Sequence, residues 1–382
     1  MKMVPVLLGW YLYNLTHSKL ILGFVGLSEV VPAILLALPA GVKVDSSDKR
    51  SLVIKLLTFY AFIVAGLGVF TSDLVFDVSQ NFRIGLIFTF VALTGMIRAY
   101  ISPSFSALLA QLVSKDDLVK AASVNSMTWL LATIIGSVLS GVLVSIWNES
   151  SVFALILGLL ILAIIIFSNI DKKPVSFDGT KSKTWDSVRE GLDFVYHQKA
   201  LFGAMSLDMF AVLFGGAIAL LPVFVKDVLN AGPNTYGLLL AATYLGNFIS
   251  ILILTKYPLK GRQGNKLIYA VAGFGVCMVI FALSKSVDLS FIALFVSGLF
   301  DGVSVIIRGT IFQIMVPDHM RGRVSSVNSI FINSSNELGQ FESGMAAEAM
   351  GTVTSVVFGG MMTIFISIFA GWKVPALKKL EY

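Results

Sequence analysis

The tetrapeptide Ser-Val-Asn-Ser occupies residues 123–126 and recurs at residues 326–329, 203 positions later. The same offset, applied without a gap, aligns further small residues: Gly136 with Gly339, and Ser140 and Gly141 with Ser343 and Gly344. Each copy follows a loop that contains basic residues and enters a predicted helix, so the two copies run in the same direction. The sequence therefore predicts two parallel, duplicated halves, whose retained small residues allow helices to pack closely in lipid.

Composition restricts the class of protein. Of the 382 residues, 56% are apolar and only 13% are charged, and the mean hydropathy is +0.87. Ordinary soluble domains carry about 25% charged residues, and the 29 Phe argue against disorder. A helix needs roughly 20 mostly apolar residues to cross a bilayer. Twelve spans are predicted, with approximate bounds 3–16, 20–41, 51–71, 84–112, 121–147, 151–170, 201–225, 234–256, 266–284, 288–316, 324–349 and 351–373.

The first predicted span, residues 3–16, is shorter than a membrane crossing. Its 14 residues reach about 21 Å at a rise of 1.5 Å per residue, whereas the hydrocarbon core is about 30 Å thick. We therefore expect the first helix to be truncated, because its upstream part is missing or its start is mis-assigned.

Basic residues are distributed unevenly between the two sides of the membrane. The loops that follow spans 2, 4, 6, 8 and 10, together with the C-terminal tail, contain 20 of the 28 Lys and Arg, and the opposite loops contain 4. Because cytoplasmic loops are enriched in Lys and Arg, the tail and the long central loop are predicted to be cytoplasmic, in a multi-pass protein of the plasma (inner) membrane. The net charge of +6 then reflects topology, and nucleic acid is excluded as a partner.

The one long polar stretch divides the chain. Within residues 171–199, apolar side chains recur at helical spacing: Trp185, Val188, Leu192, Val195 and Tyr196. Such a pattern predicts an amphipathic helix that lies at the cytoplasmic interface, and a partner-binding helix is the alternative. The predicted organisation is a six-helix bundle over 1–170, a cytoplasmic linker over 171–199 and a second six-helix bundle over 200–382.

The sequence contains no motif for catalysis or for a cofactor. It has neither a GxxxxGK[ST] loop for nucleotide phosphates nor a GxSxG nucleophile motif. His17, His197 and His319 are scattered, and with Cys277 as the single cysteine they make no metal site. We expect no cofactor, no metal and no enzymatic activity.

Ionisable residues inside predicted spans are the candidate functional residues, because a charge within a bilayer is costly. Four of them fall near the middle of the membrane: Glu29, Arg98, Asp301 and Glu337. Three lie nearer its surfaces, Asp208 and Arg308 toward the cytoplasm and Glu342 toward the outside. Each is a candidate for substrate contact or proton coupling. The alternative for each is structural, a hydrogen-bonded acid or a pair with Arg98 or Arg308 that holds helices together.

Helical geometry relates two pairs of these residues. Asp301 and Arg308 are seven residues apart, which places them on the same side of a helix but about 10 Å apart along its axis. We therefore expect a shared polar face and no easy direct pair. Glu337 and Glu342 differ by about 140° around their helix, so only one can face a central cavity.

The repeat makes the acids of the second half distinctive. With the 203-residue offset, Glu337 and Glu342 correspond to Ile134 and Leu139. The first half builds the same helix without these carboxylates, so the architecture does not require them. A carboxylate in a low-dielectric site can be neutral in one state and charged in another, and we favour proton coupling or substrate contact for Glu337.

Parallel six-helix halves are the layout of the major facilitator fold. Several stretches carry a more specific resemblance: Gly9–Thr16 with Leu22–Leu27, Ala40–Arg50, Ser206–Gly216, Phe300–Arg308, Pro317–Asn328, Ser335–Gly339 and Phe341–Gly344. Over essentially the whole chain, they resemble the major facilitator superfamily. Within it they are similar to the branch of the enterobactin exporter and the macrolide efflux proteins, the transmembrane secretion effector type.

This resemblance implies an all-α membrane protein of twelve transmembrane helices, in two six-helix bundles related by a parallel pseudo-two-fold axis. It implies a carrier that exports small amphipathic molecules, siderophore-like or drug-like, through the inner membrane on an ion gradient. We expect a monomer that works by alternating access, with protons as the coupling ion. Two alternatives stay open: a carrier of lysolipids or lipids, and a non-transporting membrane receptor or assembly factor on the same fold.

The loop after the second span is similar to the conserved gating loop of the superfamily, with Ser46 where an Arg is common. The resemblance implies a latch that closes the cytoplasmic side, whose charges dock against helix ends of the other half. Gly41 is expected to permit a tight turn as the chain leaves the helix. The residues of this predicted latch are Gly41, Asp45, Asp48, Lys49 and Arg50. A plain basic cytoplasmic loop is the alternative.

Overall fold

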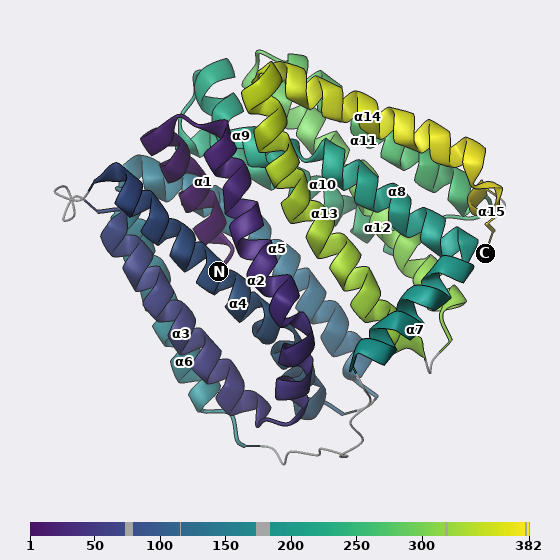
Figure 1. The fold of residues 1–382 in the computed structure, drawn as a ribbon, viewed down its shortest axis with the longest axis horizontal. Coiled ribbons are helices and arrows are strands. Elements are labelled where there is room, and N and C mark those ends of the chain that lie inside the picture. The colour runs from purple at the N-terminus through teal and green to yellow at the C-terminus, as the bar shows by residue number, and fades with distance from the viewer. Residues whose placement is uncertain (73–78, 115, 173–183, 318–319, 379, 382) are drawn as a thin grey trace. The chain divides into compact units, whose positions relative to one another are not determined.

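A computed structural model describes residues 1–382 apart from 73–78, 115, 173–183, 318–319, 379 and 382. Its regular elements are all helices over these described residues (Figure 1). Helices satisfy their own backbone hydrogen bonds, which a lipid environment requires. Ten of the described helices are long and apolar enough to cross a membrane. α1 (Met3–Thr16) is not among them because it is short, and α13 (Arg321–Met350) because it is polar.

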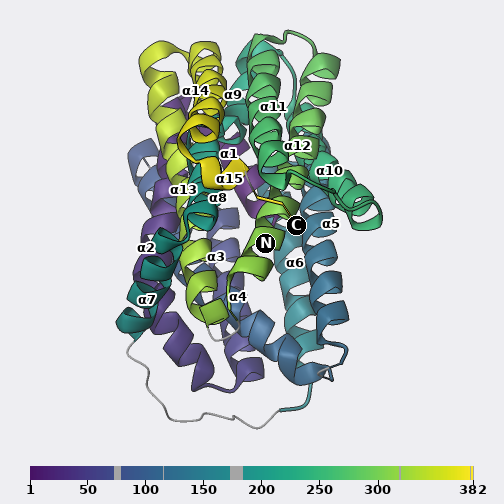
Figure 2. The ribbon, with the colours of Figure 1, turned by 90° about the vertical axis from the view of Figure 1, so that its right-hand side faces the viewer.

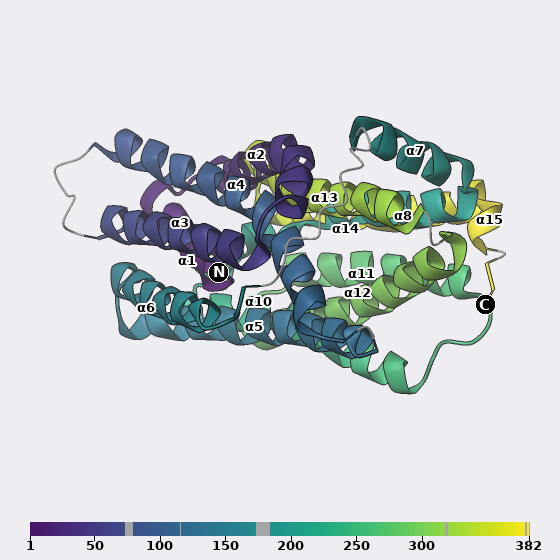
Figure 3. The same cartoon turned by 90° about the horizontal axis from the view of Figure 1, so that it is seen from below.

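The chain forms two compact units. The first comprises Met1–Leu15 and Leu27–Lys181. Its remaining helices are α2 (Lys19–Asp45, from Leu27 on), α3 (Lys49–Phe70), α4 (Gln80–Leu112), α5 (Leu118–Ile146) and α6 (Glu149–Ser168). α3 lies between α4 and α6 and packs against both (Figure 3). α3 is thereby covered on two sides. Its packing fixes the position of Lys49, where the loop after α2 ends.

The second unit comprises Thr16–Gly26 and Ser182–Tyr382. Its longer helices after residue 183 are α7 (Thr184–His197), α8 (Lys199–Gly215), α10 (Pro233–Lys256), α11 (Gln263–Leu283), α12 (Val287–Met315), α13 and α14 (Thr352–Lys373), followed by the short α15 (Pro375–Lys378). α11 packs against α14 on one side and α12 on the other, and α12 also packs along α10 (Figure 2). The first turns of α2 pack on α13, where an added Cβ at Gly23 would lie 3.2 Å from the Cα of Gly344.

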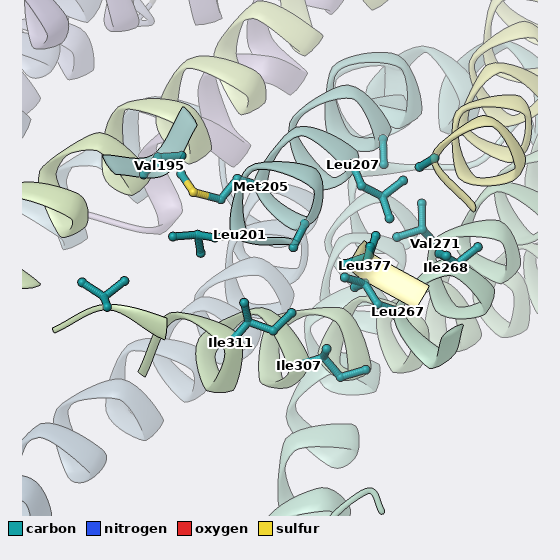
Figure 4. Packing of buried hydrophobic residues seen from close by; sticks show 14 of the residues in the cluster. Val195, Leu201, Met205, Leu207, Leu267, Ile268, Val271, Ile307, Ile311 and Leu377 are labelled. Atoms are coloured by element: carbon teal, nitrogen blue, oxygen red, sulfur yellow. The ribbon is translucent and has the colours of Figure 1, made fainter. Parts of the chain in front are cut away.

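An apolar core in the second unit joins helices that are distant in sequence (Figure 4). Its buried members come from α7, α8, α11, α12, α13 and α15 and include Val195, Leu201, Leu207, Leu267, Ile307, Ile311, Val324 and Leu377. Burial of each such side chain contributes roughly 1.5–3 kcal/mol. The core therefore holds α8 and α12 together, and these two helices carry Asp208 and Arg308.

The span predicted over 201–225 lies within one candidate membrane span, Lys199–Val228, whose helical geometry changes along its length. α8 ends at Gly215 and is followed by a 3-10 turn (η2, Ala217–Leu220), a single α-turn (α9, Leu221–Val223) and a π-helical turn (η3, Phe224–Val228). Gly216 lies at the first change of geometry, where an added Cβ would come within 3.3 Å of the carbonyl carbon of Gly339. Changes of this kind are frequent at functional sites.

A helix occupies part of the predicted linker. In α7, Val195 is buried in the core, whereas Leu192 and Tyr196 are 46% and 70% exposed. The side chains of Trp185 and Val188 lie outside the described residues, as does the stretch 173–183. α7 is tied to the start of α13 by an ion pair between Glu190 and Arg323.

Candidate functional site

In the first unit, a charged pair links α4 to α2. The Arg98 Nη1 atom lies 3.0 Å from the Glu29 Oε1 atom, and the two side chains are 40% and 24% exposed. The helices can approach so closely because position 95 is glycine. A Cβ added at Gly95 would lie 2.1 Å from the carbonyl oxygen of Glu29. One turn of α4 therefore supplies both the glycine of the close contact and the arginine that pairs with α2.

In the second unit, the matching turn of α12 carries the opposite charge. Asn247 Nδ2 on α10 donates a hydrogen bond of 2.6 Å to Asp301 Oδ2. A Cβ added at Gly298 would lie 2.0 Å from the carbonyl oxygen of Thr243.

Gly95 and Gly298 are 203 positions apart, as are Arg98 and Asp301. Sequence reasoning missed this match, although the offset already found for the Ser-Val-Asn-Ser repeat would have exposed it. The pairing across the helices required the structure.

A second ionic contact lies on α12. Arg308 Nη1 donates to Asp208 Oδ2 of α8 at 2.6 Å, and the side chains are 15% and 9% exposed. Arg308 Nε also donates to the Ser304 hydroxyl at 3.2 Å. Asp301 and Arg308 therefore bond to different neighbours, α10 and α8, although Asp301 still experiences the positive charge of Arg308.

Glu337 of α13 comes near the Asp301 site. Its side chain is 4% exposed, and Gln340 Nε2 donates to Glu337 Oε2 at 2.8 Å. Tyr244 of α10 interacts electrostatically with both Asp301 and Glu337. Two of the candidate acids thus share one tyrosine as a neighbour.

Glu342 lies apart from this group in the described contacts. It is partly buried and accepts a hydrogen bond of 3.5 Å from the Ser343 hydroxyl next to it.

The predicted turn at Gly41 is wrong. α2 continues through Gly41 to Asp45, and the chain turns at Ser46 and Ser47. The C-terminal end of the helix is held by the buried Lys49, whose Nζ donates to the carbonyl oxygens of Val44 (2.7 Å) and Ser47 (3.0 Å). A lysine that satisfies terminal carbonyls stabilises a helix end. The side chain of Asp45 lies outside the described residues.

The other two charges of this loop also contact helix ends within the first unit. Asp48 caps α3 by accepting from the Ser51 amide at 3.2 Å. Partial burial alone would raise the pKa of Asp48, but hydrogen bonds from the Ser51 hydroxyl and amide outweigh it and hold the pKa below its ordinary value. Arg50 donates to the carbonyl oxygens of Phe167 and Ser168 at the end of α6. The loop therefore joins the ends of α2, α3 and α6.

The chemistry of these sites is that of charges and protons. The described residues contain no group of three or more His, Cys, Asp or Glu placed to hold a metal ion. The site in the second unit offers carboxylates, an amide, a phenol and a guanidinium. Such groups can bind a polar or charged ligand and can accept and release a proton.

Comparison with known proteins gives concordant results. Residues 2–381 match the family described as transmembrane secretion effector. The Staphyloferrin A transporter of Staphylococcus aureus is 23% identical over 365 residues, which are 94% of this chain and 89% of that protein. Macrolide efflux protein A of Streptococcus pyogenes is 22% identical over 97% of this chain and 91% of its own length. The Lysophospholipid transporter LplT of Photorhabdus laumondii is 26% identical over 58% of this chain and 56% of its own length.

A solved structure shares the fold. The bacterial homologue of the human lysosomal transporter Spinster, in its inward-facing and occupied conformation, superposes with a TM-score of 0.77 at 12% identity, over 99% of this chain and 94% of that one. The predicted fold class is confirmed: the chain is an all-α membrane protein with the two six-helix bundles of the major facilitator transporters.

Proposed function

Because the chain belongs to the transmembrane secretion effector family of major facilitator transporters, we propose that it exports small amphipathic molecules across the inner membrane by proton-driven alternating access. The observation that carries this proposal is the set of carboxylates inside the helices of the second unit. Asp208 and Glu337 are buried there, and Asp301 is partly buried. Ionisable groups at such positions are expensive and mark ion or substrate pathways.

Glu337 is the proposed proton-coupling residue. Its carboxylate is buried and accepts from the neutral amide of Gln340, and the aligned residue of the first half is Ile134. A carboxylate in such surroundings takes up and releases a proton when its solvation changes between two states. The transported molecule shifts the balance of these states only through unequal affinity for them.

The loop over residues 41–50 is proposed as the cytoplasmic gate. Lys49, Asp48 and Arg50 hold the ends of α2, α3 and α6 respectively. This bonding supports a gate in which three helix ends move as one piece. The distribution of Lys and Arg among the loops supports a cytoplasmic C-terminus and central loop, and we propose a monomer as the working unit.

The test uses the purified protein in proteoliposomes with an imposed proton gradient. Three fluorescent probes share a dansyl group and differ in charge: a dansyl quaternary ammonium, dansylamide and dansylglycine. We expect the gradient to drive at least one of them, and Glu337→Gln to abolish this movement while leaving expression and exchange without a gradient intact. Glu348→Gln, on the exposed end of the same helix, is the control. Normal gradient-driven flux in Glu337→Gln would contradict the assignment, and no movement of any probe would contradict export.

Lysolipid transport is the second candidate, supported by the similarity to LplT over 58% of the chain. It predicts that a fluorescent lysophospholipid in the same proteoliposomes changes leaflet while the dansyl probes do not. The lysophospholipid carries an NBD group, which dithionite reduces only in the outer leaflet, so the unquenched fraction reports its change of leaflet. Binding of a probe without any flux would instead support a receptor.

A further inference from the structure

The acids that flank Arg308 in the second unit, Asp208 and Asp301, have partners of different charge. The guanidinium of Arg308 makes its short contact with Asp208, at 2.6 Å. Asp301, in contrast, is hydrogen-bonded to the amide of Asn247, also at 2.6 Å. Asp208 is 7% exposed, whereas Asp301 is only partly buried. Asp301 is therefore the acid that a ligand can reach.

From this arrangement we infer that Asp301 recognises a positively charged ammonium group on the exported molecule. The inference rests on the proposed transport function and specifies its substrate class. A carboxylate in a poorly hydrated site attracts a cation strongly, because the effective dielectric constant there is low. An anionic ligand would meet repulsion at the same position.

Two further residues of α10, the helix that carries Asn247, suit an ammonium ligand. Tyr244 is close enough to interact electrostatically with Asp301, and aromatic faces attract ammonium groups. Thr243, on the turn of α10 before Asn247, is 7% exposed, and its hydroxyl oxygen has no hydrogen-bond partner in the described part of the chain. A buried hydroxyl without a partner is uncommon and provides an acceptor for a donor group brought by a ligand.

The first unit supplies the internal comparison. At the aligned position, Arg98 is paired with Glu29, so cation and anion lie on the same pair of helices. The second unit repeats the close helix contact and places an acid opposite a neutral amide. The excess negative charge is therefore a property of the second unit and not of the repeated architecture.

The experiment compares binding of the cationic dansyl ammonium and the anionic dansylglycine to the purified full-length protein, followed by dansyl emission. We expect the wild type to prefer the cation by about tenfold, the effect of one well-placed charge pair. Asp301→Asn should bring the two affinities within about twofold, because the charge that distinguishes the probes is removed. Asp301→Glu should retain the preference, and Asp288→Asn, an exposed acid on the same helix, should not change it.

Each result decides the inference. Equal binding of both probes by the wild type, a preference for dansylglycine, no binding of the cation, or a retained preference in a folded Asp301→Asn protein would each overturn it. A monodisperse elution profile shows that the variant is folded. If the gradient moves dansylglycine or dansylamide but not the cation, export stands and the inference fails. If the cation binds through Asp301 but nothing is transported, the proposed function fails instead.

Discussion

Each unit has a glycine at the same position of the repeat, where two helices come close together, but the charges beside these glycines differ. Gly95 and Gly298 each admit a carbonyl oxygen of a neighbouring helix, from Glu29 and Thr243 respectively. One turn later, the first unit has a cation paired with an acid and the second has an acid paired with an amide. The glycine is what the close contact requires. The charged residue differs between the units, so the shared architecture does not dictate its identity.

The comparison extends to α5 and α13. These helices are related by the 203-residue offset, and the small residues Gly136 and Gly339 are retained in both. Glu337 nevertheless stands where the first unit has Ile134. An isoleucine needs no partner in lipid, whereas a carboxylate does. The duplicated scaffold thus separates what holds the fold from what differs in the second unit.

The largest expected effect comes from breaking the ion pair of the second unit. Asp208→Asn keeps the shape of the buried side chain but leaves Arg308, whose side chain is only 15% exposed, without the carboxylate that lies 2.6 Å from it. Loss of one partner of a buried pair costs about 3 kcal/mol or more. We expect a clear fall in the apparent melting temperature in detergent, followed by tryptophan fluorescence.

The matched variant in the first unit is Glu29→Gln. Its pair with Arg98 is more exposed, at 24% and 40%, so the cost should be about 1 kcal/mol or less. Equal destabilisation by the two variants would show that burial does not distinguish the pairs and would break the comparison.

The second effect tests the shared glycine. A methyl group at Gly298 or Gly95 would lie 2.0 or 2.1 Å from a carbonyl oxygen, so the helices must separate. Gly298→Ala and Gly95→Ala should each destabilise the protein by about 2 kcal/mol, a typical cost of overpacking. Thermal unfolding of both variants measures it.

The chain offers controls on the same two helices. Gly309 on α12 and Gly85 on α4 have no atom within 4 Å of an added Cβ. Their replacement by Ala should raise stability by about 0.5 kcal/mol, since Gly weakens a helix interior. If only one of the two packed glycines proves sensitive, the units do not share the contact.

A feature could be predicted from the sequence when neighbouring residues determine it, and not when residues that are distant in the chain must meet. Hydropathy and the repeat predicted the helical membrane fold, because spans and duplications are properties of contiguous sequence. The Gly95 and Gly298 match lay within reach of the same offset. A pair with Arg308 was one of the alternatives considered for each acid. The choice of Asp208 as its partner could not be predicted, because those residues are 100 positions apart and meet only through the packing of α8 on α12. The change of helix geometry after Gly215 was also missed, although Gly215, Gly216 and Pro222 are helix-breaking residues within this apolar span.

The loop after α2 was misjudged for a related reason. A glycine in a loop signature suggested a turn, but α2 continues past Gly41 because Lys49 satisfies the carbonyl oxygen of Val44 at its end. Propensity at one position was outweighed by a side chain eight residues later. Such a contact depends on the path of the loop, which brings the lysine back to the end of the helix, and composition does not reveal that path.

A smaller effect than those of Asp208→Asn and the packed glycines separates the two loops that follow α2 and α10. In the first unit, α3 is capped locally by Asp48. In the second, α11 begins after Arg262 without a side-chain cap of its own, and the Arg262 amide instead donates at 3.0 Å to Glu381, a residue of the C-terminal tail. Asp48→Ala should cost about 1 kcal/mol. Asp48→Asn should cost less, because Asn is also a good cap.

The contribution of Asp48 to stability should depend on pH, and the shift of its pKa gives the direction. The pKa of Asp48 is lower in the folded protein than its ordinary value, so the unfolded chain binds the proton more readily. The stabilisation is therefore present above the ordinary pKa of Asp, about 3.9, and is lost as pH falls through that value toward the lowered one. Between about pH 6 and pH 3, the difference in unfolding free energy between wild type and Asp48→Ala should shrink. Because Asn cannot titrate, the stability of Asp48→Asn relative to Asp48→Ala should stay constant over this pH range. A difference that is constant with pH would mean that the cap acts through its shape alone, and local capping by charge would no longer distinguish the first loop from the second.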